Sequence, residues 1–450
     1  MAAAAAVHGR DEASHDDGRH LLPASSSWEL PSRRVLRNIL RRLPRNPDFA
    51  GATFLCKPWL ALPGDGGVVV AEPQRVMPGL LLPEDRAVDP AARGILSLAD
   101  GKLHEVSFPH AGRGARCVGS ERGWLVMVER GAPGVAGAAG SDTIHVVHPL
   151  LPGQEFRLPD EFSLFEAQIG APEERYLLWP RLPGQAYMAD RPIETSAELL
   201  QRVFKAEEAG GRGPYIAEIA ISCSPAAAAA GGPDCVALCV YRRRCCLAVA
   251  RPGDASWVRV RLGWECRGAI LSVAHHRGSF YVVCYEGTVL RVTVPPAGSA
   301  GAAAAPRLEM FANKPERNWW NLWCQRWWLV GDAGDGGLVF VGLDKCLSTR
   351  EPRLHVYRWD EALGFWRRPK TFGGRALFLG CRGAAFFADA RRLPWCAEDC
   401  VYFTGNDRLL RREDIIVRCY DMRSRKTYVV ANAGPNEGMV PPVWVMPFHE

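Results

Sequence analysis

Apolar residues near the N-terminus follow a helical pattern. Between residues 32 and 43 they recur at Val35, Leu36, Ile39, Leu40 and Leu43. This spacing places them on one stripe of an amphipathic helix. Ser32 is suited to cap the helix and Pro44 to end it. A second apolar stretch follows over residues 49–62. Helices this short bury too little surface for a core of their own, so the stripe must pack on the rest of the chain or on a partner.

From about residue 66 onward, short runs of β-branched and aromatic residues alternate with Gly, Pro, Asp and Asn. The runs cover residues 124–128, 144–147, 236–241, 246–249, 257–260, 338–341, 353–359, 384–388, 401–403 and 415–420. Residues 280–284 and 288–294, joined by a short link that includes Gly287, predict a hairpin. Many short strands with few helices predict a mainly β fold, either a sandwich, a barrel or a propeller.

Other segments complete the predicted organisation. Residues 1–26 hold almost no large apolar side chains, so we expect them to be disordered. Thr195 and Glu198 form a capping box that opens an expected helix ending near Gly210. Residues 131–140, 224–233 and 296–306 are rich in Ala, Gly and Pro. They predict flexible surface loops.

Composition narrows the class of protein. The 450 residues are 48% hydrophobic and carry a net charge of +6, which is too mild an excess to indicate a nucleic-acid partner. The 15 cysteines, without a signal peptide before them, favour a reducing compartment. No apolar run reaches the ~18 residues of a membrane helix. We therefore expect a cytoplasmic or nuclear protein that binds no membrane.

No group of residues predicts catalysis. His275-His276 are adjacent and predict a solvated turn, since neighbouring side chains on extended chain point apart. The cysteine spacings lack the paired halves of a structural zinc site and favour buried strand cysteines. Arg242-Arg243-Arg244 predicts a basic turn, either solvated or facing an acidic partner. Among Trp319, Trp320, Trp323, Trp327 and Trp328 we expect mostly core residues. The sequence thus predicts no catalytic, cofactor or metal site, and a protein that is not an enzyme.

The N-terminal residues resemble an F-box. The resemblance rests on Ser27-Trp28-Glu29-Leu30-Pro31, the apolar helix, Asp48-Phe49 and Cys56-Lys57-Pro58-Trp59. It implies adaptor contacts by Leu30, Pro31, Val35, Leu36, Ile39, Leu40, Leu43, Cys56 and Trp59. Pro58 departs from the pattern, because proline in a helix interior costs about 3 kcal/mol or more. Either the third helix begins there, or the segment is a degenerate F-box.

The rest of the chain resembles the plant KIB-type β-propeller family. The resemblance rests on Gly123-Trp124-Leu125, on His148-Pro149-Leu150 with Arg157-Leu158-Pro159, and on residues 270–281. Val356-Tyr357-Arg358-Trp359-Asp360, Ala376-Leu377-Phe378-Leu379-Gly380, Cys400-Val401-Tyr402-Phe403-Thr404 and residues 441–447 continue it. It implies one β-propeller over residues 66–447. A blade takes ~40–50 residues, so roughly six to eight blades are expected.

Together the resemblances imply a two-part adaptor. Residues 27–62 would dock on the Skp-type adaptor of a cullin–RING ubiquitin ligase, by laying the apolar stripe in a groove. The propeller would recruit an unknown protein target through its loops. The alternative is a propeller that acts by binding alone, with a degenerate F-box that recruits no ligase.

Overall fold

The structure is a computed structural model. It describes residues 78–446 except for residues 84–91, 113, 130–141, 150–153, 162, 165–215, 243, 263–265, 267–268, 285–286, 300–304, 316–323, 333–336, 346–351, 381–383, 394, 406–413 and 436–441. The expected disordered tail, the F-box-like segment and the expected helix near residues 195–210 lie outside these residues.

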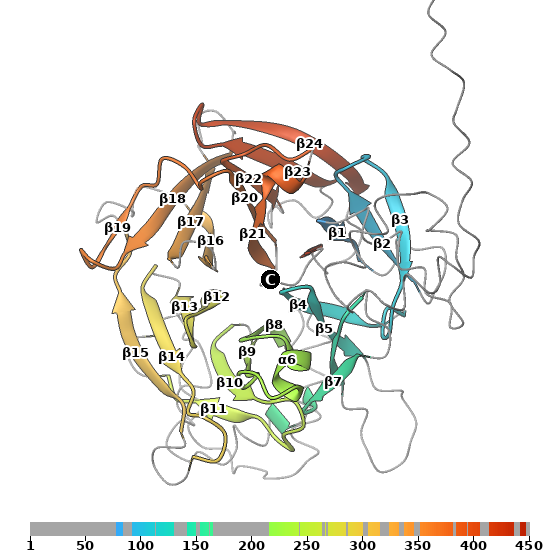
Figure 1. Cartoon of the computed structure of the whole chain (residues 1–450), viewed down its shortest axis with the longest axis vertical. Coiled ribbons are helices and arrows are strands. Elements are labelled where there is room, and N and C mark those ends of the chain that lie inside the picture. Colours follow the sequence, from blue (N-terminus) through green and yellow to red (C-terminus); the bar gives the residue numbers. More distant parts are fainter. Residues whose placement is uncertain are drawn as a thin grey trace, which may run out of the picture. The chain divides into compact units, whose positions relative to one another are not determined.

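Within this part of the chain, six sheets stand around a central axis and form a β-propeller (Figure 1). Blade 1 consists of β1 (Gly79–Leu81), β2 (Ala92–Ser97), β3 (Leu103–Ser107) and the last strand, β25 (Val443–Val445). Blade 2 consists of β4 (Arg116–Glu121), β5 (Trp124–Glu129), β6 (Thr143–Val147) and β7 (Glu155–Leu158). Blade 3 consists of β8 (Ile216–Ile221), β9 (Ala237–Tyr241), β10 (Cys246–Ala250) and β11 (Val258–Val260).

The other three blades follow in chain order. Blade 4 consists of β12 (Ile270–His276), β13 (Ser279–Cys284), β14 (Val289–Thr293) and β15 (Arg307–Ala312). Blade 5 consists of β16 (Cys324–Gly331), β17 (Leu338–Lys345), β18 (Pro352–Asp360) and β19 (Phe365–Arg367). Blade 6 has five strands in the order β21-β20-β22-β23-β24. They are β20 (Arg375–Leu379), β21 (Ala385–Asp389), β22 (Cys400–Gly405), β23 (Asp414–Asp421) and β24 (Lys426–Pro435).

The C-terminal strand closes the ring. Strand β25 pairs antiparallel with β1, with Trp444 opposite Leu80, so both ends of the propeller contribute to blade 1. The Trp444 side chain is fully buried, and its Nε1–H donates to the carbonyl oxygen of Leu379 in blade 6 at 3.0 Å. One tryptophan therefore ties the first and last blades together.

The core lies between the blades, which explains why the strands are continuous apolar runs. In β5, Leu125 and Met127 face a cluster shared by blades 6, 1 and 2. Val126 and Val128, from the opposite face of the same strand, belong to the cluster shared by blades 2 and 3. A strand covered on both faces needs apolar residues at every position, as in buried parallel sheets.

Glycines permit the closest approach of neighbouring innermost strands. A Cβ at Gly119 in β4 would overlap the carbonyl oxygen of Ile219 in β8, and a Cβ at Gly331 in β16 would overlap that of His275 in β12. The innermost strands β4, β8, β12 and β16 also share an irregular register near their first residues. This repeated bulge is a blade signature that the sequence pattern did not reveal.

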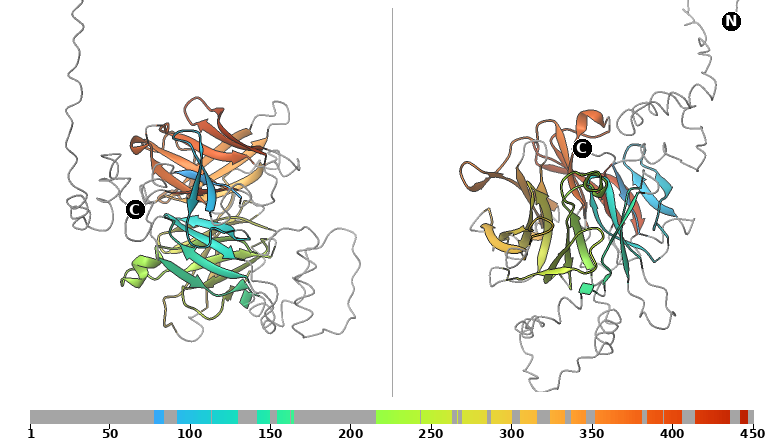
Figure 2. Two further views of the ribbon diagram at one scale, coloured as in Figure 1. Left: turned by 90° about the vertical axis from the view of Figure 1, so that its right-hand side faces the viewer. Right: turned by 60° about the horizontal axis from the view of Figure 1, so that its bottom comes forward.

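Helix is scarce among the described residues. It comprises α6 (Pro225–Ala229), the short η6 (Ala390–Arg392) and a few helical residues at Glu161, Ser163 and Leu164. Helix α6 stands at one end of blade 3 (Figures 1 and 2). Its N-cap Ser224 accepts hydrogen bonds from Ala227 N–H and from the indole N–H of Trp124. The prediction of a flexible loop at residues 224–233 was therefore wrong here. Pro225 and the alanines after it form a helix, because its N-cap residue Ser224 is held in place by the hydrogen bond from Trp124. Within the described ranges, no helix has the length and hydrophobicity needed to cross a bilayer.

The predicted strands are confirmed at every run named above, and the ring shows six blades. The predicted hairpin is confirmed as β13 and β14. Trp327 and Trp328 lie in the core as expected, whereas Trp319, Trp320 and Trp323 lie outside the described residues.

Candidate functional site: an exposed edge strand and a histidine–glutamate cluster

Strand β24 presents an open edge. It pairs with β23 on one side, and within the described residues no strand pairs with its other side. Its middle carries three consecutive exposed apolar residues. Tyr428 is 52% exposed, Val429 66% and Val430 43%. The register between β23 and β24 shifts beside Val429, so Val430 has no partner residue in the ladder. This bulge interrupts the normal alternation between inward and outward side chains, and the result is a contiguous apolar patch.

Basic residues border this patch. The turn between β23 and β24 carries Arg423 and Arg425, and β24 begins with Lys426; all three are exposed. At its other end the strand stops at Pro435. Charges and prolines are the devices by which proteins protect open edges from pairing. Here they stand at the two ends of β24, while the apolar middle remains available.

The other large exposed apolar side chains are single. Among the described residues they are Leu103 on β3, Val258 on β11, Met310 on β15, Phe365 on β19 and Leu363 in the turn before β19. All of them lie on the outermost strand of a blade or beside it. Scattered exposed apolar residues are ordinary. The run of three on β24 is the exception.

The predicted solvated turn at His275-His276 was wrong. Both residues lie in β12, where His275 pairs with Phe280 of β13 and His276 pairs with Ser279. The turn consists of the next two residues, Arg277 and Gly278. His276 is buried, and His275 packs against Phe280 with ring centroids 5.0 Å apart. Burial, with smaller contributions from the positive charges of Arg122 and His276, lowers the pKa of His275 to about 4. His275 is therefore a neutral structural residue at neutral pH.

The predicted basic turn at Arg242-Arg243-Arg244 is partly structural. Arg244 donates from Nη1 to Oε2 of the buried Glu218 at 2.9 Å, and to the carbonyl oxygens of Ile270 and Leu271 at 3.2 and 3.1 Å. Because Glu218 and Arg244 lie in blade 3 and the two carbonyls in blade 4, this guanidinium joins neighbouring blades. It is neither solvated nor free for an acidic partner.

The expectation of buried strand cysteines is confirmed for half of the residues it named, because Cys235 is buried just before β9 while Cys245 and Cys396 are partly exposed and lie outside strands. Cys239, Cys246 and Cys400 are buried strand residues, and burial raises the pKa of Cys239 and Cys246. A thiol held protonated is a poor metal ligand and a poor nucleophile.

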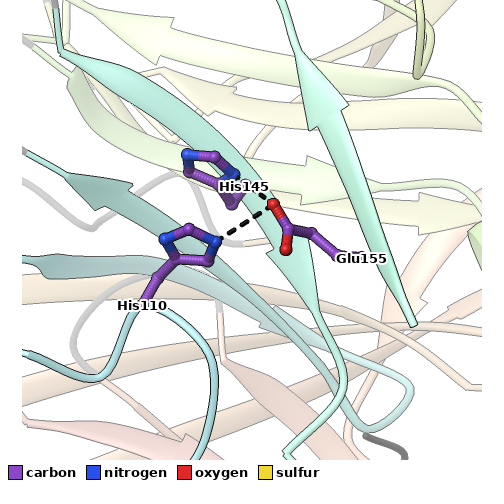
Figure 3. Close-up of side chains that lie close together, drawn as sticks. All are labelled: His110, His145 and Glu155. Atoms are coloured by element: carbon purple, nitrogen blue, oxygen red, sulfur yellow. Dashed lines mark hydrogen bonds and ion pairs between the residues drawn. The ribbon is translucent and has the colours of Figure 1, made fainter. Parts of the chain in front are cut away.

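A second site lies in blade 2, where His110, His145 and Glu155 come together (Figure 3). Glu155 Oε1 lies 3.0 Å from Nε2 of His110 and 2.7 Å from Nδ1 of His145. The two imidazole rings are stacked, with centroids 3.7 Å apart and planes 15° apart. The second nitrogen of His110 lies 2.8 Å from Oε2 of Glu129, and that of His145 lies 2.9 Å from Oγ1 of Thr143.

Strand pairing explains how these side chains meet. His145 in β6 pairs with Arg157 in β7, so Glu155, two residues before Arg157, is its diagonal neighbour on the same face. His110 comes from the segment that links β3 of blade 1 to β4 of blade 2. Its backbone is in the left-handed region, with φ of 59°. That segment carries the His110 ring onto the face of blade 2.

Burial and hydrogen bonding act in opposite directions in this cluster. Burial lowers the pKa of His145, and the hydrogen bond that His145 makes to the Glu155 carboxylate acts against this lowering. Burial works to raise the pKa of Glu155, but the hydrogen bonds with His145 and His110 hold it below its ordinary value. Glu155 is therefore an ionised carboxylate facing two ring nitrogens.

No sequence pattern indicated this cluster. The three residues belong to three separate elements, and none stands in a metal-binding spacing. The expectation of no metal ligand rested on spacings within single segments. The nine residues with an implied adaptor role, from Leu30 to Trp59, lie outside the described residues, so their role stays a prediction.

Comparisons with known proteins agree with the fold. A family model described as KIB1-4 beta-propeller matches residues 95–427. No curated protein matches the chain.

Several solved structures show limited likeness. A prolyl endopeptidase is 11% identical with a TM-score of 0.28, over 75% of this chain and 37% of its own. The Cps50 (Swd1) beta-propeller domain of Myceliophteria thermophila is 12% identical with a TM-score of 0.30, over 76% of this chain and 77% of its own. A functionally unknown protein from Desulfotomaculum acetoxidans is 11% identical with a TM-score of 0.29, over 79% and 97%. The chain spans little more than a third of the endopeptidase, and values this low say nothing about what it binds or does.

Proposed function

The chain belongs to the KIB1-4 beta-propeller family, and from that premise we propose that it is the substrate-recognition subunit of a cullin–RING ubiquitin ligase. The propeller recruits a protein target, and residues 27–62 dock on a Skp-type adaptor. The proposal is one of binding without catalysis, in the cytoplasm or nucleus.

The observation that carries the target-binding part is the open edge of β24. Its outer edge, with which no described strand pairs, can accept an extended segment as a further strand, and Tyr428, Val429 and Val430 supply apolar contacts beside it. The basic turn at one end favours acidic residues on the incoming segment. The expected target therefore has an extended apolar stretch with acidic residues at the end that meets Arg423, Arg425 and Lys426.

The adaptor-binding part is supported by the sequence. The stripe of Leu36, Ile39, Leu40 and Leu43 needs an apolar groove to cover it. Pro58 is the observation that favours the alternative, a propeller whose degenerate F-box recruits no ligase. Binding of the purified Skp-type adaptor distinguishes the two.

Target capture tests the edge directly. We expect proximity labelling by the full chain carrying Leu36→Asp and Leu40→Asp to accumulate targets, because recruitment to the ligase is blocked. Adding Val429→Lys should remove those targets. Val258→Lys is the matched control, since Val258 is 48% exposed on β11, the outermost strand of blade 3. Equal labelling with and without Val429→Lys would refute the edge as the binding site.

A screen of hydrolase substrates tests the non-catalytic part. We expect no turnover above that of a heat-denatured sample. Reproducible turnover by the folded chain would contradict it.

A further inference from the structure

The ring nitrogens in the blade 2 cluster are arranged as in a metal site. His110 Nε2, His145 Nδ1 and a carboxylate oxygen of Glu155 all lie within 4.8 Å of one another (Figure 3). Two histidines and one glutamate are a common zinc ligand set, and ligand atoms of a tetrahedral zinc ion stand about 3.3 Å apart given bond lengths of about 2.0–2.2 Å. The ligand atoms are therefore already near zinc spacing, and because the two rings are stacked with planes 15° apart, one imidazole must turn out of the stack for both nitrogens to point at one ion.

The partners of the other two nitrogens match the outer contacts of a metal centre. Metal-binding histidines usually donate their second ring N–H to a carboxylate or another acceptor, which fixes the ring and its tautomer. Here Glu129 faces Nδ1 of His110, and the Thr143 hydroxyl faces Nε2 of His145. Both imidazoles are thus oriented with their remaining nitrogen toward Glu155.

The acceptors around the cluster are compatible with a metal ion. Both nitrogens of His110 face carboxylate oxygens, one of Glu129 and one of Glu155. A metal ion between His110, His145 and Glu155 would leave each histidine one N–H, which donates to Glu129 or to Thr143.

The surroundings suit a bound ion as well. His145 is buried, and its cross-strand neighbour Met127 is fully buried in the core shared by blades 6, 1 and 2. Such an apolar shell limits water access and strengthens ligand bonds. The Glu155 side chain is 39% exposed, which leaves a side of the cluster open to solvent for a water as fourth ligand.

We propose that His110, His145 and Glu155 bind one zinc ion in blade 2. The ion fastens the segment between β3 and β4 onto β6 and β7, so it links blade 1 to blade 2. Zinc bound to the folded chain alone stabilises the fold by mass action. This role is independent of adaptor and target binding.

Calorimetric titration of the metal-free full chain with zinc chloride tests the site, followed by cobalt(II) spectroscopy. We expect one ion per chain and a rise in the unfolding midpoint that saturates at that ratio. Cobalt should give weak visible bands without the intense thiolate charge-transfer band, which excludes the 15 cysteines as ligands. Magnesium and calcium should not compete, because imidazole is a poor ligand for them.

Variants identify the ligands. His110→Ala should weaken zinc binding at least 100-fold, and Glu129→Gln should weaken it 10- to 100-fold. His104→Ala is the matched control, since His104 in β3 also contacts a carboxylate, that of Asp100 in the preceding turn. Because His110 lies in a connecting segment, circular dichroism should show that the His110→Ala variant is folded. If that variant is not folded, the zinc affinity of Glu129→Gln alone tests the site. Absence of stoichiometric zinc in the wild-type chain, a cobalt spectrum dominated by thiolate, or equal affinity in His104→Ala and Glu129→Gln would each overturn the proposal.

Discussion

Replacing Asp332 with asparagine tests how the blades hold together. Asp332 directly follows β16, and its side chain is fully buried. Its Oδ2 accepts from Arg358 at 3.1 Å and from Arg375 at 2.9 Å, and its Oδ1 accepts a second bond from Arg375. Arg375 belongs to blade 6, so this carboxylate joins blades 5 and 6. The substitution removes the carboxylate charge that faces both guanidiniums.

The expected cost follows from burial. Removing one partner of a buried ion pair costs about 3–5 kcal/mol. The Arg375 and Arg358 side chains are 17% and 24% exposed, and water therefore screens part of the stranded charge. We expect a loss near the lower end of that range, about 3 kcal/mol.

Guanidinium chloride unfolding, followed by tryptophan fluorescence, measures this loss. Glu361→Gln is the matched control, because its pair with Arg277 also joins two blades but is 52% and 58% exposed. An exposed pair of this kind contributes about 0–1 kcal/mol. The double variant Asp332→Asn with Arg375→Met should lose less than the sum of the single variants. A loss for Asp332→Asn no larger than for Glu361→Gln would refute the reasoning.

Three further predictions follow from other features. The pKa of His275, about 4 when folded and near 6.5 when unfolded, means that the unfolded chain binds more protons between these values. The contribution of neutral His275 to stability is full above pH 6.5 and is lost as the pH falls toward 4. The urea unfolding midpoint of the His275→Asn variant should therefore depend less on pH between these values than that of the wild type. Equal pH dependence of the two midpoints would contradict this. Gly331→Ala should destabilise the chain by about 1–3 kcal/mol in thermal unfolding, because the new Cβ meets the backbone of β12. Gly337→Ala is the matched control, because its Cβ would make only ordinary contacts at 3.5 Å or more. Val429→Lys should weaken the binding of an isolated target segment at least 10-fold, measured by fluorescence anisotropy, while leaving the unfolding midpoint unchanged. Unchanged affinity would exclude the β24 edge as the binding site.

The strand pattern made much of the fold predictable. Runs such as residues 124–128 are apolar at every position because blades cover both faces of the strand, and a strand of that kind differs clearly from a loop. The number of blades was predictable only as a range. The blades have a common backbone geometry, including the bulge in the innermost strand, but the residues at these bulges follow no common sequence motif.

The sites were less predictable, because they depend on long-range contacts. His110, His145 and Glu155 meet only after β6 pairs with β7 and the segment after β3 crosses to blade 2. The role of Arg244 was unpredictable for the same reason. In the sequence it is one of three arginines in a turn, and its buried partner Glu218 becomes visible only through the pairing of β8 with β9. The exposure of Val429 accompanies a register shift between β23 and β24 that the local sequence does not predict.

Binding of the purified full-length chain to a Skp-type adaptor, followed by isothermal titration calorimetry, tests the proposed function most directly. We predict a one-to-one complex with the wild-type chain. Leu36→Asp with Leu40→Asp should weaken it at least 100-fold, since each buried leucine contributes roughly 1.5–3 kcal/mol. A wild-type chain that forms no complex, or a complex that both substitutions leave intact, would contradict the role in ubiquitin ligation.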